Sequence, residues 1–451
     1  MSGAPGAPGP APGTAGANPS DVAPYMFSQM MRNIATSGFQ IADHNQPASF
    51  SNPGCVLASP SWPSYPGNVA TISQDYVFNW TRDAAIAVSA VLGQPPALVP
   101  PEASTEVFMN YVNFVSNCQT KGGDIGQAKY TPEAGVTGAA DESDGPALRV
   151  LTILQGFAAL GAFQGAATSV INADLTYLLN NSRYQQPTVT HWEDTFGQSI
   201  FARAVQIRCF NQVTAAGAPF SAAPGATAQA AADWLEGQIS QHWCATNNWY
   251  VSVLDAERLT GDPAAPYDPS VDPILACVYG DGIPCTDPKL LSTAAQVRGQ
   301  WAAGGASYYH INYADASIGV GPLIGRYLGD EYDGESLTSN TGHPWAVCTC
   351  AFAQLYYKLA GSINSGSAVP SDPLATTFLT QVGVADTDPP ATVVSKLQAA
   401  GDSMLNAVVY HSNHLELSEQ FDQQTGFEKS VSNLTWSYAA FLLAIGARAS
   451  I

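Results

Sequence analysis

The 451-residue sequence predicts one large all-α domain. Several apolar segments have the length and the start signals of helices, whereas neither a series of alternating polar and apolar strands nor a βαβ rhythm is present. The connections between these segments are rich in Gly and Pro and longer than usual, which is typical of functional loops. We expect helices that are apolar on most faces and therefore pack inside a large helical assembly.

Helix-start signals support the individual elements. Ser20 is a candidate N-cap for the first helix, and Asp144 is one for the second, which has Pro146 in its first turn. A proline, Pro344, is again expected in the first turn of the fifth helix. The predicted helices are 21–38, 144–163, 197–216, 227–243, 343–362 and 434–450.

The predicted domain organisation is simple. Residues 1–19 are Gly, Ala and Pro in large part, without the charged and apolar regions of a signal peptide, and we expect a flexible leader. Residues 20–451 are expected to form a single domain because no low-complexity linker follows residue 20. Residues 366–377 are expected to form a surface loop.

The charge balance restricts the partners. Lys and Arg number 16 against 36 Asp and Glu, a formal net charge of −20, which disfavours nucleic acid and anionic membranes and suits a neutral ligand. No uninterrupted apolar stretch reaches about 18 residues, so no membrane span is expected. The acidic, lysine-poor composition is typical of a secreted, extracellular protein.

The cysteines and histidines do not form a metal-binding pattern. The eight Cys include no CxxC pair, and the seven His show no metal-ligand spacing, so neither a metal nor another cofactor is expected. Cys277 and Cys285 flank the loop CVYGDGIPC, and a disulfide between them is expected in an oxidising compartment. Cys348 and Cys350 lie in an apolar helical run and are expected to be buried thiols.

The segment SQDYVFNWTRDAA (73–85) combines aromatic and charged residues. Arg82 and Asp83 follow Tyr76, Phe78 and Trp80. An aromatic ring can pack against a sugar while an Arg–Asp pair binds its hydroxyls. The segment equally fits a helix start capped by Asp83 and packed by core aromatics.

The segment THWEDTFGQS (190–199) places Glu193 between Trp192 and Asp194. An indole beside a carboxyl group removes water from it and favours the protonated acid. The alternative is a loop acid beside a core tryptophan.

A third segment, 415–441, gathers three carboxylates, Glu416, Glu419 and Asp422, in a chain with only 12% charged residues. They fit a solvated loop before a helix. They also fit a site in which Glu419 is the partner of Glu193 and Trp436 lines the same cavity, because glycoside hydrolysis needs one protonated and one ionised carboxyl group. Glu416 and Asp422 are then expected to point away from the site or to contact solvent.

Taken in order, these motifs resemble the fungal glucoamylases of glycoside hydrolase family 15. The resemblance runs from about residue 56 to 445. It is carried by DYVFNWTRDAA, DGPALR, THWEDTFGQSIF, GRYLGD, HPWAVCT, LSEQFD and LTWSYAA. The CVYGDGIPC loop also resembles a disulfide loop of that family.

The resemblance implies an (α/α)6 barrel whose long loops form a pocket at one end. It implies an exo-acting, inverting hydrolase, like glucan 1,4-α-glucosidases, that releases β-glucose from the non-reducing ends of starch-like chains. By motif, Glu193 would be the general acid and Glu419 the general base, with about 6.5–9.5 Å between the carboxyl groups. The expected partner is a neutral oligo- or polysaccharide, and we expect a monomer. The residues expected to bind sugar are Tyr76, Trp80, Arg82, Asp83, Trp192, Asp194, Arg326, Asp330, Trp345 and Trp436.

The sequence departs from the family pattern outside these motifs. Before DGPALR the family usually has a Trp and an Arg, but this chain reads TGAADES. His343 stands where an Asn is usual, and the segment between Arg326 and Trp345 contains an additional loop. We expect no starch-binding module after residue 451. We expect an exo-glycosidase whose accepted linkage or aglycone has changed.

The sequence also contains three sequons for N-glycosylation, and two alternative functions remain open. Asn180 is the best candidate for N-glycosylation, because Asn79 and Asn433 lie inside pocket motifs. The alternatives in function are the same barrel acting on isomalto-oligosaccharides, trehalose or other α-glucosides, and a catalytically silent sugar-binding barrel. Phosphorolysis is disfavoured because Arg and Lys are scarce.

Overall fold

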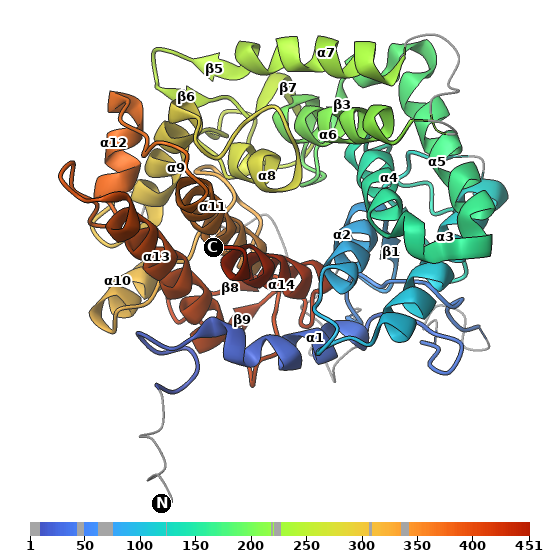
Figure 1. Cartoon of the computed structure of the whole chain (residues 1–451), viewed down its shortest axis with the longest axis horizontal. Helices are drawn as coiled ribbons and strands as arrows, with labels where there is room; N and C mark the ends of the chain where they lie inside the picture. Colours follow the sequence, from blue (N-terminus) through green and yellow to red (C-terminus); the bar gives the residue numbers. More distant parts are fainter. Residues whose placement is uncertain are drawn as a thin grey trace, which may run out of the picture.

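The computed structural model describes residues 10–42, 49–61, 75–122, 124–217, 220, 227–305, 309–334 and 342–451. Within them, six helices surround a common axis and form the inner layer of a double-layered barrel (Figure 1). Each inner helix packs against the next and the last packs against the first, so the ring is closed. The inner helices are α2 (Thr81–Leu92), α4 (Asp144–Gly156), α6 (Ile200–Ala216), α8 (Asp272–Tyr279), α11 (Ala346–Asn364) and α14 (Thr435–Ala449).

An outer layer of helices covers this ring. In each pair an outer helix packs on one inner helix: α1 on α14, α3 on α2, α5 on α4, α7 on α6, α9 on α8 and α13 on α11. The outer helices are α1 (Ala23–Met31), α3 (Pro101–Gly122), α5 (Gln164–Leu179), α7 (Ala228–Ile239), α9 (Pro288–Trp301) and α13 (Pro390–His411). Two shorter helices, α10 (His310–Ser317) and α12 (Pro373–Thr380), lie outside the two rings. This is the (α/α)6 arrangement that the sequence resemblance implied, and the all-α prediction is confirmed.

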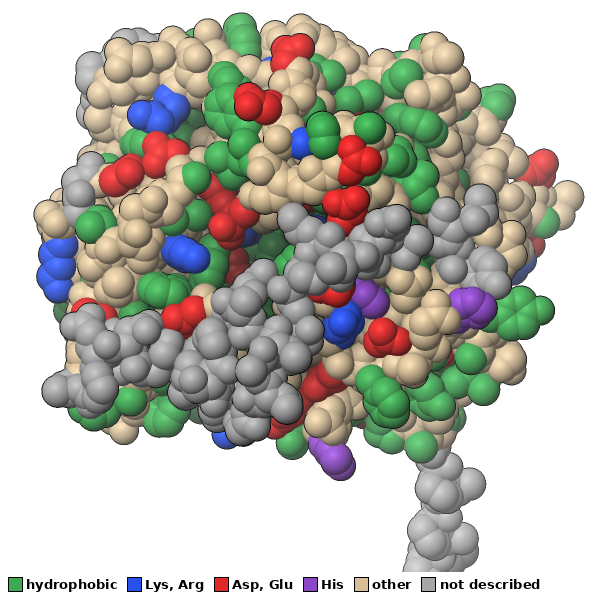
Figure 2. Space-filling model, turned by 180° about the vertical axis from the view of Figure 1, so that it is seen from behind, with side chains coloured by type: hydrophobic (Ala, Val, Ile, Leu, Met, Phe, Trp, Pro, Cys, Tyr) green, Lys and Arg blue, Asp and Glu red, His purple; other side chains and the backbone are tan. Residues whose placement is uncertain are grey.

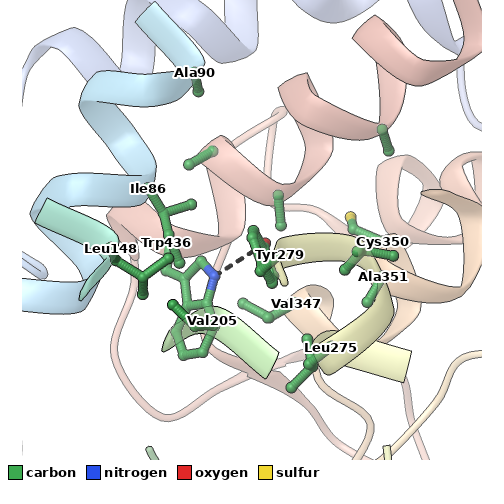
Figure 3. Packing of buried hydrophobic residues seen from close by; sticks show 14 of the residues in the cluster. Ile86, Ala90, Leu148, Val205, Leu275, Tyr279, Val347, Cys350, Ala351 and Trp436 are labelled. Atoms are coloured by element: carbon green, nitrogen blue, oxygen red, sulfur yellow. Dashed lines mark hydrogen bonds between the residues drawn. The ribbon is translucent and has the colours of Figure 1, made fainter. Parts of the chain in front are cut away.

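The barrel interior is filled with apolar side chains, because every inner helix turns part of its surface to the axis. Figure 3 shows side chains from all six inner helices meeting there, with Trp436 of α14 donating its indole N–H to the Tyr279 hydroxyl of α8 across 3.2 Å. Nearly every residue of α4 and α11 is buried, which explains why these segments are apolar on most faces.

Small residues allow the two layers to approach closely. A Cβ atom at Gly401 of α13 would lie 2.5 Å from the ring of Tyr357 in α11, so only glycine fits at this contact.

Short antiparallel strands lie in the loops around the barrel. Strand β1 ends directly before α2, and β4 ends directly before α6, so each fixes the chain that enters an inner helix. The pairs are β1 (Asn79–Trp80) with β2 (Lys129–Tyr130), β3 (Thr188–Val189) with β4 (Thr195–Ser199), β4 with β7 (Val253–Arg258), β5 (Trp243–Cys244) with β6 (Trp249–Tyr250), and β8 (Gln420–Phe421) with β9 (Glu428–Lys429).

The start of the chain differs slightly from the prediction. A short 3-10 helix, η1 (Pro19–Val22), precedes α1, and Asn18 caps it by accepting a hydrogen bond from the Ser20 amide across 3.2 Å. The cap is therefore Asn18 rather than Ser20. Residues 1–9 of the expected leader lie outside the described residues, and the division at residue 20 stays a prediction.

Five other predicted helix boundaries also need correction. Ser143, not Asp144, is the N-cap of α4, and that helix gives way at Phe157 to the 3-10 helix η2 (Phe157–Phe163). Helix α11 begins only at Ala346, because Trp345 forms a β-bridge with Gln420 that keeps Pro344 outside the helix. Residues 197–199 belong to β4, and α7 ends at Ile239 before the 3-10 helix η4 (Ser240–His242).

The segment Asp144–Gln185 is long and apolar enough to cross a membrane by length and composition alone. It is not one continuous helix, because Gly161 has a positive φ of 50° and Asn181 and Ser182 break the 3-10 helix η3 (Asn180–Gln185). The longest piece, α5, has 16 residues, or about 24 Å, which is shorter than the roughly 30 Å of a bilayer core. The absence of a membrane partner stays a prediction.

All eight cysteines are free thiols in the structure, so the predicted Cys277–Cys285 disulfide is not formed in it. Cys277 is buried inside α8, and burial raises the pKa of its thiol to about 12, which disfavours the thiolate that disulfide exchange requires. Cys348 and Cys350 are buried thiols, as predicted.

Candidate active site

A cavity of about 830 Å³ opens at the end of the barrel where the inner helices begin. Figure 2 shows the face opposite to that of Figure 1, which is hollowed near its centre and carries acidic side chains around the hollow. Arg82 and Asp83 lie in the first turn of α2 and Trp436 in the first turn of α14. The positive ends of helix dipoles thus point toward the cavity and favour negative charge there. Of the predicted site residues, Tyr76, Trp80, Arg82, Asp83, Trp192, Glu193, Asp194, Arg326, Trp345, Glu419 and Trp436 line it.

Glu419 lies on the cavity wall and is only 4% exposed. Its Oε1 accepts a hydrogen bond from the Tyr76 hydroxyl (3.0 Å), and its Oε2 accepts from the hydroxyls of Tyr332 (3.2 Å) and Ser430. Burial raises the pKa of Glu419 to about 7, although the hydrogen bonds from Ser430 and Tyr76 and the charge of Arg326 act in the opposite direction. The three hydrogen bonds together hold the carboxyl group in one orientation.

Glu193 lies on the same cavity in different surroundings. It sits in the tight turn between β3 and β4, where its amide donates to the Thr190 carbonyl across 2.8 Å. Its φ of 60° is left-handed, which costs a residue with a side chain about 1–2 kcal/mol. The Glu193 side chain is exposed, and its Oε1 accepts a hydrogen bond from the indole N–H of Trp80 across 2.7 Å. The turn thus directs a solvent-accessible carboxyl group to a defined position.

Arg82 is the centre of a buried acidic cluster. Its Nη1 donates to Glu142 Oε2 (2.5 Å) and Asp144 Oδ2 (3.3 Å), and its Nε lies 3.6 Å from Asp83 Oδ2. The guanidinium group also lies over the ring of Trp436, 5.1 Å from its centroid. Three carboxyl groups thus share one guanidinium.

The cluster retains capacity for a ligand. Burial raises the pKa of Asp83 to about 6, against the opposing charge of Arg82. Arg82 Nε and Asp83 Oδ2 are buried and have no hydrogen-bond partner among the described residues. Both residues line the cavity, so these atoms can bind hydroxyl groups of a ligand.

Three tryptophans form an aromatic wall. The ring centroid of Trp192 lies 5.3 Å from that of Trp345 and 6.0 Å from that of Trp436. The Trp192 indole donates to Asp272 Oδ1 across 2.7 Å, and Asp272 begins α8. Trp345 lines the cavity, and its buried indole N–H has no hydrogen-bond partner within the described chain.

Arg326 is fixed by a bidentate contact with Asp330. Its Nε and Nη2 donate to the two oxygens of Asp330 at 2.8 and 2.6 Å, and its Nη1 lies 3.7 Å from Asp194 Oδ2. The Tyr327 hydroxyl donates to the same Asp194 oxygen at 2.5 Å. Asp330 is not among the residues that line the cavity, and it orients Arg326. Its predicted contact with sugar stays a prediction.

Several residues of the site were not predicted. Tyr332 and Ser430 contact Glu419, Glu142 contacts Arg82, and Lys129 Nζ lies 4.3 Å from the Trp80 ring centroid. Tyr332 could have been predicted as a site residue, because it is an aromatic residue two positions after Asp330 of the GRYLGD motif. The sequence contains no such signal for Ser430.

The two histidines near the motifs have different positions. His191 is buried on the cavity wall, with Nε2 3.5 Å from Asp272 Oδ1. His343 Nδ1 accepts from the Gln423 amide across 3.1 Å and is structural. Among the described residues no group of three or more His, Cys, Asp and Glu could hold a metal, and the expectation that none is needed stays a prediction.

Glu416 and Asp422 have structural contacts outside the cavity. Glu416 Oε2 accepts from the Asn433 amide at 3.1 Å. Asp422 Oδ1 accepts from the backbone amides of Gln424 (3.0 Å) and Thr425 (2.8 Å). Burial raises the pKa of Asp422, but these hydrogen bonds outweigh it and hold the pKa below its ordinary value. Of the three neighbouring acids, Glu419 therefore lines the cavity, whereas Glu416 and Asp422 hold the surrounding loop in place.

A helical barrel with two carboxyl groups in contrasting surroundings on one aromatic-walled cavity defines the class of the protein. It is a glycoside hydrolase of the (α/α)6 type.

Comparison with known proteins identifies the family within this class. The family model for the glycosyl hydrolases of family 15 matches residues 29–446, and the chain belongs to this family. It is 27% identical to glucoamylase 1 of Rhizopus oryzae over 426 residues, covering 85% of this chain and 66% of that protein. It is 26% identical to a probable glucoamylase of Schizosaccharomyces pombe, covering 94% of this chain and 90% of that protein. The solved family 15 glucoamylase from Hypocrea jecorina has the same fold, with a TM-score of 0.77 at 21% identity over 95% of this chain and 72% of that one.

Proposed function

We propose that the protein is an exo-acting, inverting glycoside hydrolase that releases β-glucose from the non-reducing ends of α-glucans or related α-glucosides. The observation that carries the proposal is the contrast between Glu193 and Glu419 on one cavity. Glu193 is exposed on a strained turn, whereas Glu419 is buried and held by three hydroxyl groups. The glucoamylase relatives support glucose as the product.

The two carboxyl groups would act as acid and base. Protonated Glu193 gives its proton to the glycosidic oxygen while the bond from C1 to that oxygen breaks. Water attacks C1 from the opposite face, and Glu419 accepts the proton that this water loses. The sugar leaves with inverted configuration, and each carboxyl group returns to its starting state by exchange with solvent.

The remaining groups would hold the terminal glucose. Arg82 Nε and Asp83 Oδ2, which have no hydrogen-bond partner within the described part of the chain, would bind hydroxyl groups. The rings of Trp192, Trp345 and Trp436 offer apolar faces, and Tyr76 and Trp80 lie beside the two acids. Arg326 and Asp194 complete the polar wall.

The accepted linkage is expected to differ from that of starch-specific relatives. The cavity is also lined by Lys129, Arg258, Thr260 and Glu331. The segment TGAADES, which lacks the usual Trp and Arg, contains Glu142 and leads into α4. We infer that the subsites beyond the terminal glucose rely on these polar groups rather than on a tryptophan.

A product screen tests the proposal. Purified enzyme is incubated with maltotriose and with isomaltotriose, and the anomer of the released glucose is followed by NMR. β-Glucose should appear first, and Glu193→Gln and Glu419→Gln should each reduce kcat by several orders of magnitude while circular dichroism remains unchanged. Initial release of α-glucose, or near-native turnover by either variant, would contradict the assignment.

We also propose that the protein is secreted, that it is a monomer and that it carries a glycan at Asn180. The acidic surface and low lysine content support a secreted monomer. Asn180 is exposed and available for a glycan, whereas Asn79 is buried and its amide donates to the Val56 carbonyl across 2.9 Å. Expression in a fungal host, with analysis of the medium by size-exclusion chromatography and glycosidase treatment, tests all three.

A further inference from the structure

His191 is a buried histidine of the candidate active site that takes no part in the mechanism proposed above. It lines the catalytic cavity and is only 3% exposed. The imidazole lies between two aromatic rings, with its centroid 4.4 Å from that of Trp192 and 4.4 Å from that of Phe201 in α6. We propose that His191 is a positioning residue that holds the carboxylate of Asp272, which in turn fixes the Trp192 indole beside the general acid. The inference rests on the proposed function, because it adds a residue to the same reaction.

Asp272 links His191 to the cavity wall. It begins α8 and is fully buried, and its Oδ1 accepts the indole N–H of Trp192 across 2.7 Å. The Tyr267 hydroxyl donates to Oδ2 across a longer 3.4 Å. Within the described part of the chain, the only basic side chain in salt-bridge range of this carboxylate is His191, whose Nε2 lies 3.5 Å from the same Oδ1. A buried carboxylate is costly unless donors surround it, so a donor at this place stabilises Asp272.

The ring nitrogens of His191 have no other partner. Both Nδ1 and Nε2 are buried and make no hydrogen bond among the described residues. A leucine would fill the space between the two aromatic rings without burying polar atoms, whereas an imidazole leaves a donor and an acceptor unsatisfied there. The 3.5 Å separation from Asp272 is longer than an ordinary hydrogen bond, and contacts of this kind often tighten when a substrate binds. We therefore expect the His191 Nε2–H to donate to Asp272 when a sugar packs against Trp192.

Trp192 carries the effect of His191 to the reacting groups. Its ring packs against that of Trp345, and the guanidinium of Arg326 lies 5.2 Å from its centroid. Trp192 also directly precedes Glu193 in the tight turn between β3 and β4. A rotation of the Trp192 ring would displace both the apolar wall and the acid, and a misplacement of about 1 Å can cost about 100-fold in rate.

Two substitutions at His191 separate the donor from the packing. His191→Leu fills a similar space without a donor, whereas His191→Gln places an amide N–H near the position of Nε2. With maltotriose as substrate, His191→Leu should lower kcat/KM at least about tenfold, because a displaced wall weakens both the binding and the alignment of the sugar. His191→Gln should stay within about threefold of wild type, since the N–H donor to Asp272 is kept. Phe201→Leu alters the other ring that packs on the imidazole and is the matched control for loss of packing.

A double-mutant cycle with Trp192→Phe tests the route of the effect. Phenylalanine keeps an aromatic wall but has no indole N–H to bind Asp272. If His191 acts through this hydrogen bond, adding His191→Leu to Trp192→Phe should lower kcat/KM by less than about twofold. The NMR signal of the Trp192 indole N–H, assigned by its loss in Trp192→Phe, gives a second measurement that needs no turnover. It should shift in His191→Leu and stay near its wild-type position in His191→Gln.

The outcomes are distinguishable. A loss of activity in His191→Leu that His191→Gln rescues, and that vanishes in the Trp192→Phe background, supports the positioning role. Wild-type kinetics in His191→Leu, or an equal loss in His191→Gln or Phe201→Leu, overturns it. A loss that persists undiminished in the Trp192→Phe background, or an indole signal that is the same in wild type and His191→Leu, also overturns it. If the indole signal shifts as expected but wild type releases no glucose from any α-glucoside, the proposed function fails while the contact among His191, Asp272 and Trp192 stands.

Discussion

Arg82 Nη1 donates to Glu142 Oε2 across 2.5 Å, although Glu142 itself does not line the catalytic cavity. Glu142 thus lies behind the guanidinium that we propose to bind sugar, and it fixes the position of this group together with Asp144, which accepts from the same nitrogen at 3.3 Å. Both residues lie where the chain enters α4. This relationship places part of the binding apparatus inside the one stretch that departs most from the family pattern.

Glu142→Ala should therefore weaken substrate binding more than turnover. Without Glu142, Arg82 keeps only Asp144 and Asp83 as anionic neighbours and loses its shortest contact, which is worth about 1.5–3 kcal/mol for a charged hydrogen bond. We expect KM for maltotriose to rise about tenfold with a smaller change in kcat. Glu142→Gln keeps an acceptor oxygen and should restore most of the affinity. If Gln and Ala raised KM equally, the charge and not the position of Arg82 would be what Glu142 supplies.

We expect Trp80 to support turnover through one hydrogen bond. Its indole N–H donates a hydrogen bond to Glu193 Oε1 across 2.7 Å. Trp80→Phe keeps an aromatic ring beside Tyr76 but removes the donor, so Glu193 can rotate away from its reacting position. We expect kcat for maltotriose to fall about 10- to 100-fold with KM nearly unchanged. Phe78→Leu, at the neighbouring ring, is the control, and an equal fall in that variant would point to general loss of packing.

The stability of the protein should depend on pH through Glu419. Its pKa is raised by burial from an ordinary 4.5 to about 7 in the folded state. The folded protein therefore retains a proton that the unfolded chain has lost between these values, so this stabilisation is complete below about pH 4.5 and is lost as the pH rises toward 7. Glu419→Gln cannot lose a proton there.

Thermal melting of the wild type and Glu419→Gln at several pH values checks this. The melting temperature of the variant, relative to wild type, should rise between pH 4.5 and pH 7.5. A constant difference between Glu419→Gln and wild type would mean that Glu419 is ionised throughout the range.

Sequence reasoning located the residues that lie within long, distinctive motifs. Arg82, Glu193, Glu419 and Trp436 were all found in this way, and the structure brings them to one cavity. The inner helices could also be predicted from the sequence, because a helix that is buried on most faces has an almost continuous run of apolar residues, as α11 does.

The remainder depends on contacts between distant segments. Tyr332 reaches Glu419 across 87 positions, and Glu142 reaches Arg82 across 60, so neither pairing leaves a local pattern. The start of α11 was misplaced because a bridge from Gln420 holds Trp345 in an extended conformation. Local helix propensity at Pro344 could not reveal that restraint.

The contact between Tyr332 and Glu419, which the sequence did not predict, can be tested directly. Its hydroxyl contacts Glu419 Oε2 at 3.2 Å and the Tyr76 hydroxyl at 3.1 Å, so it links the two sides of the carboxyl group. Tyr332→Phe should lower kcat about tenfold, since the base loses one of its orienting donors but keeps Ser430 and Tyr76. The acid limb of the pH profile of kcat/KM should also move to higher pH, because a hydrogen bond that favours the ionised carboxylate has been removed and its pKa rises further. Tyr327→Phe, which removes a hydroxyl bonded to Asp194 rather than to Glu419, should leave that limb in place. A shift of the limb to lower pH in Tyr332→Phe would show that Glu419 is not the group that must be ionised for catalysis.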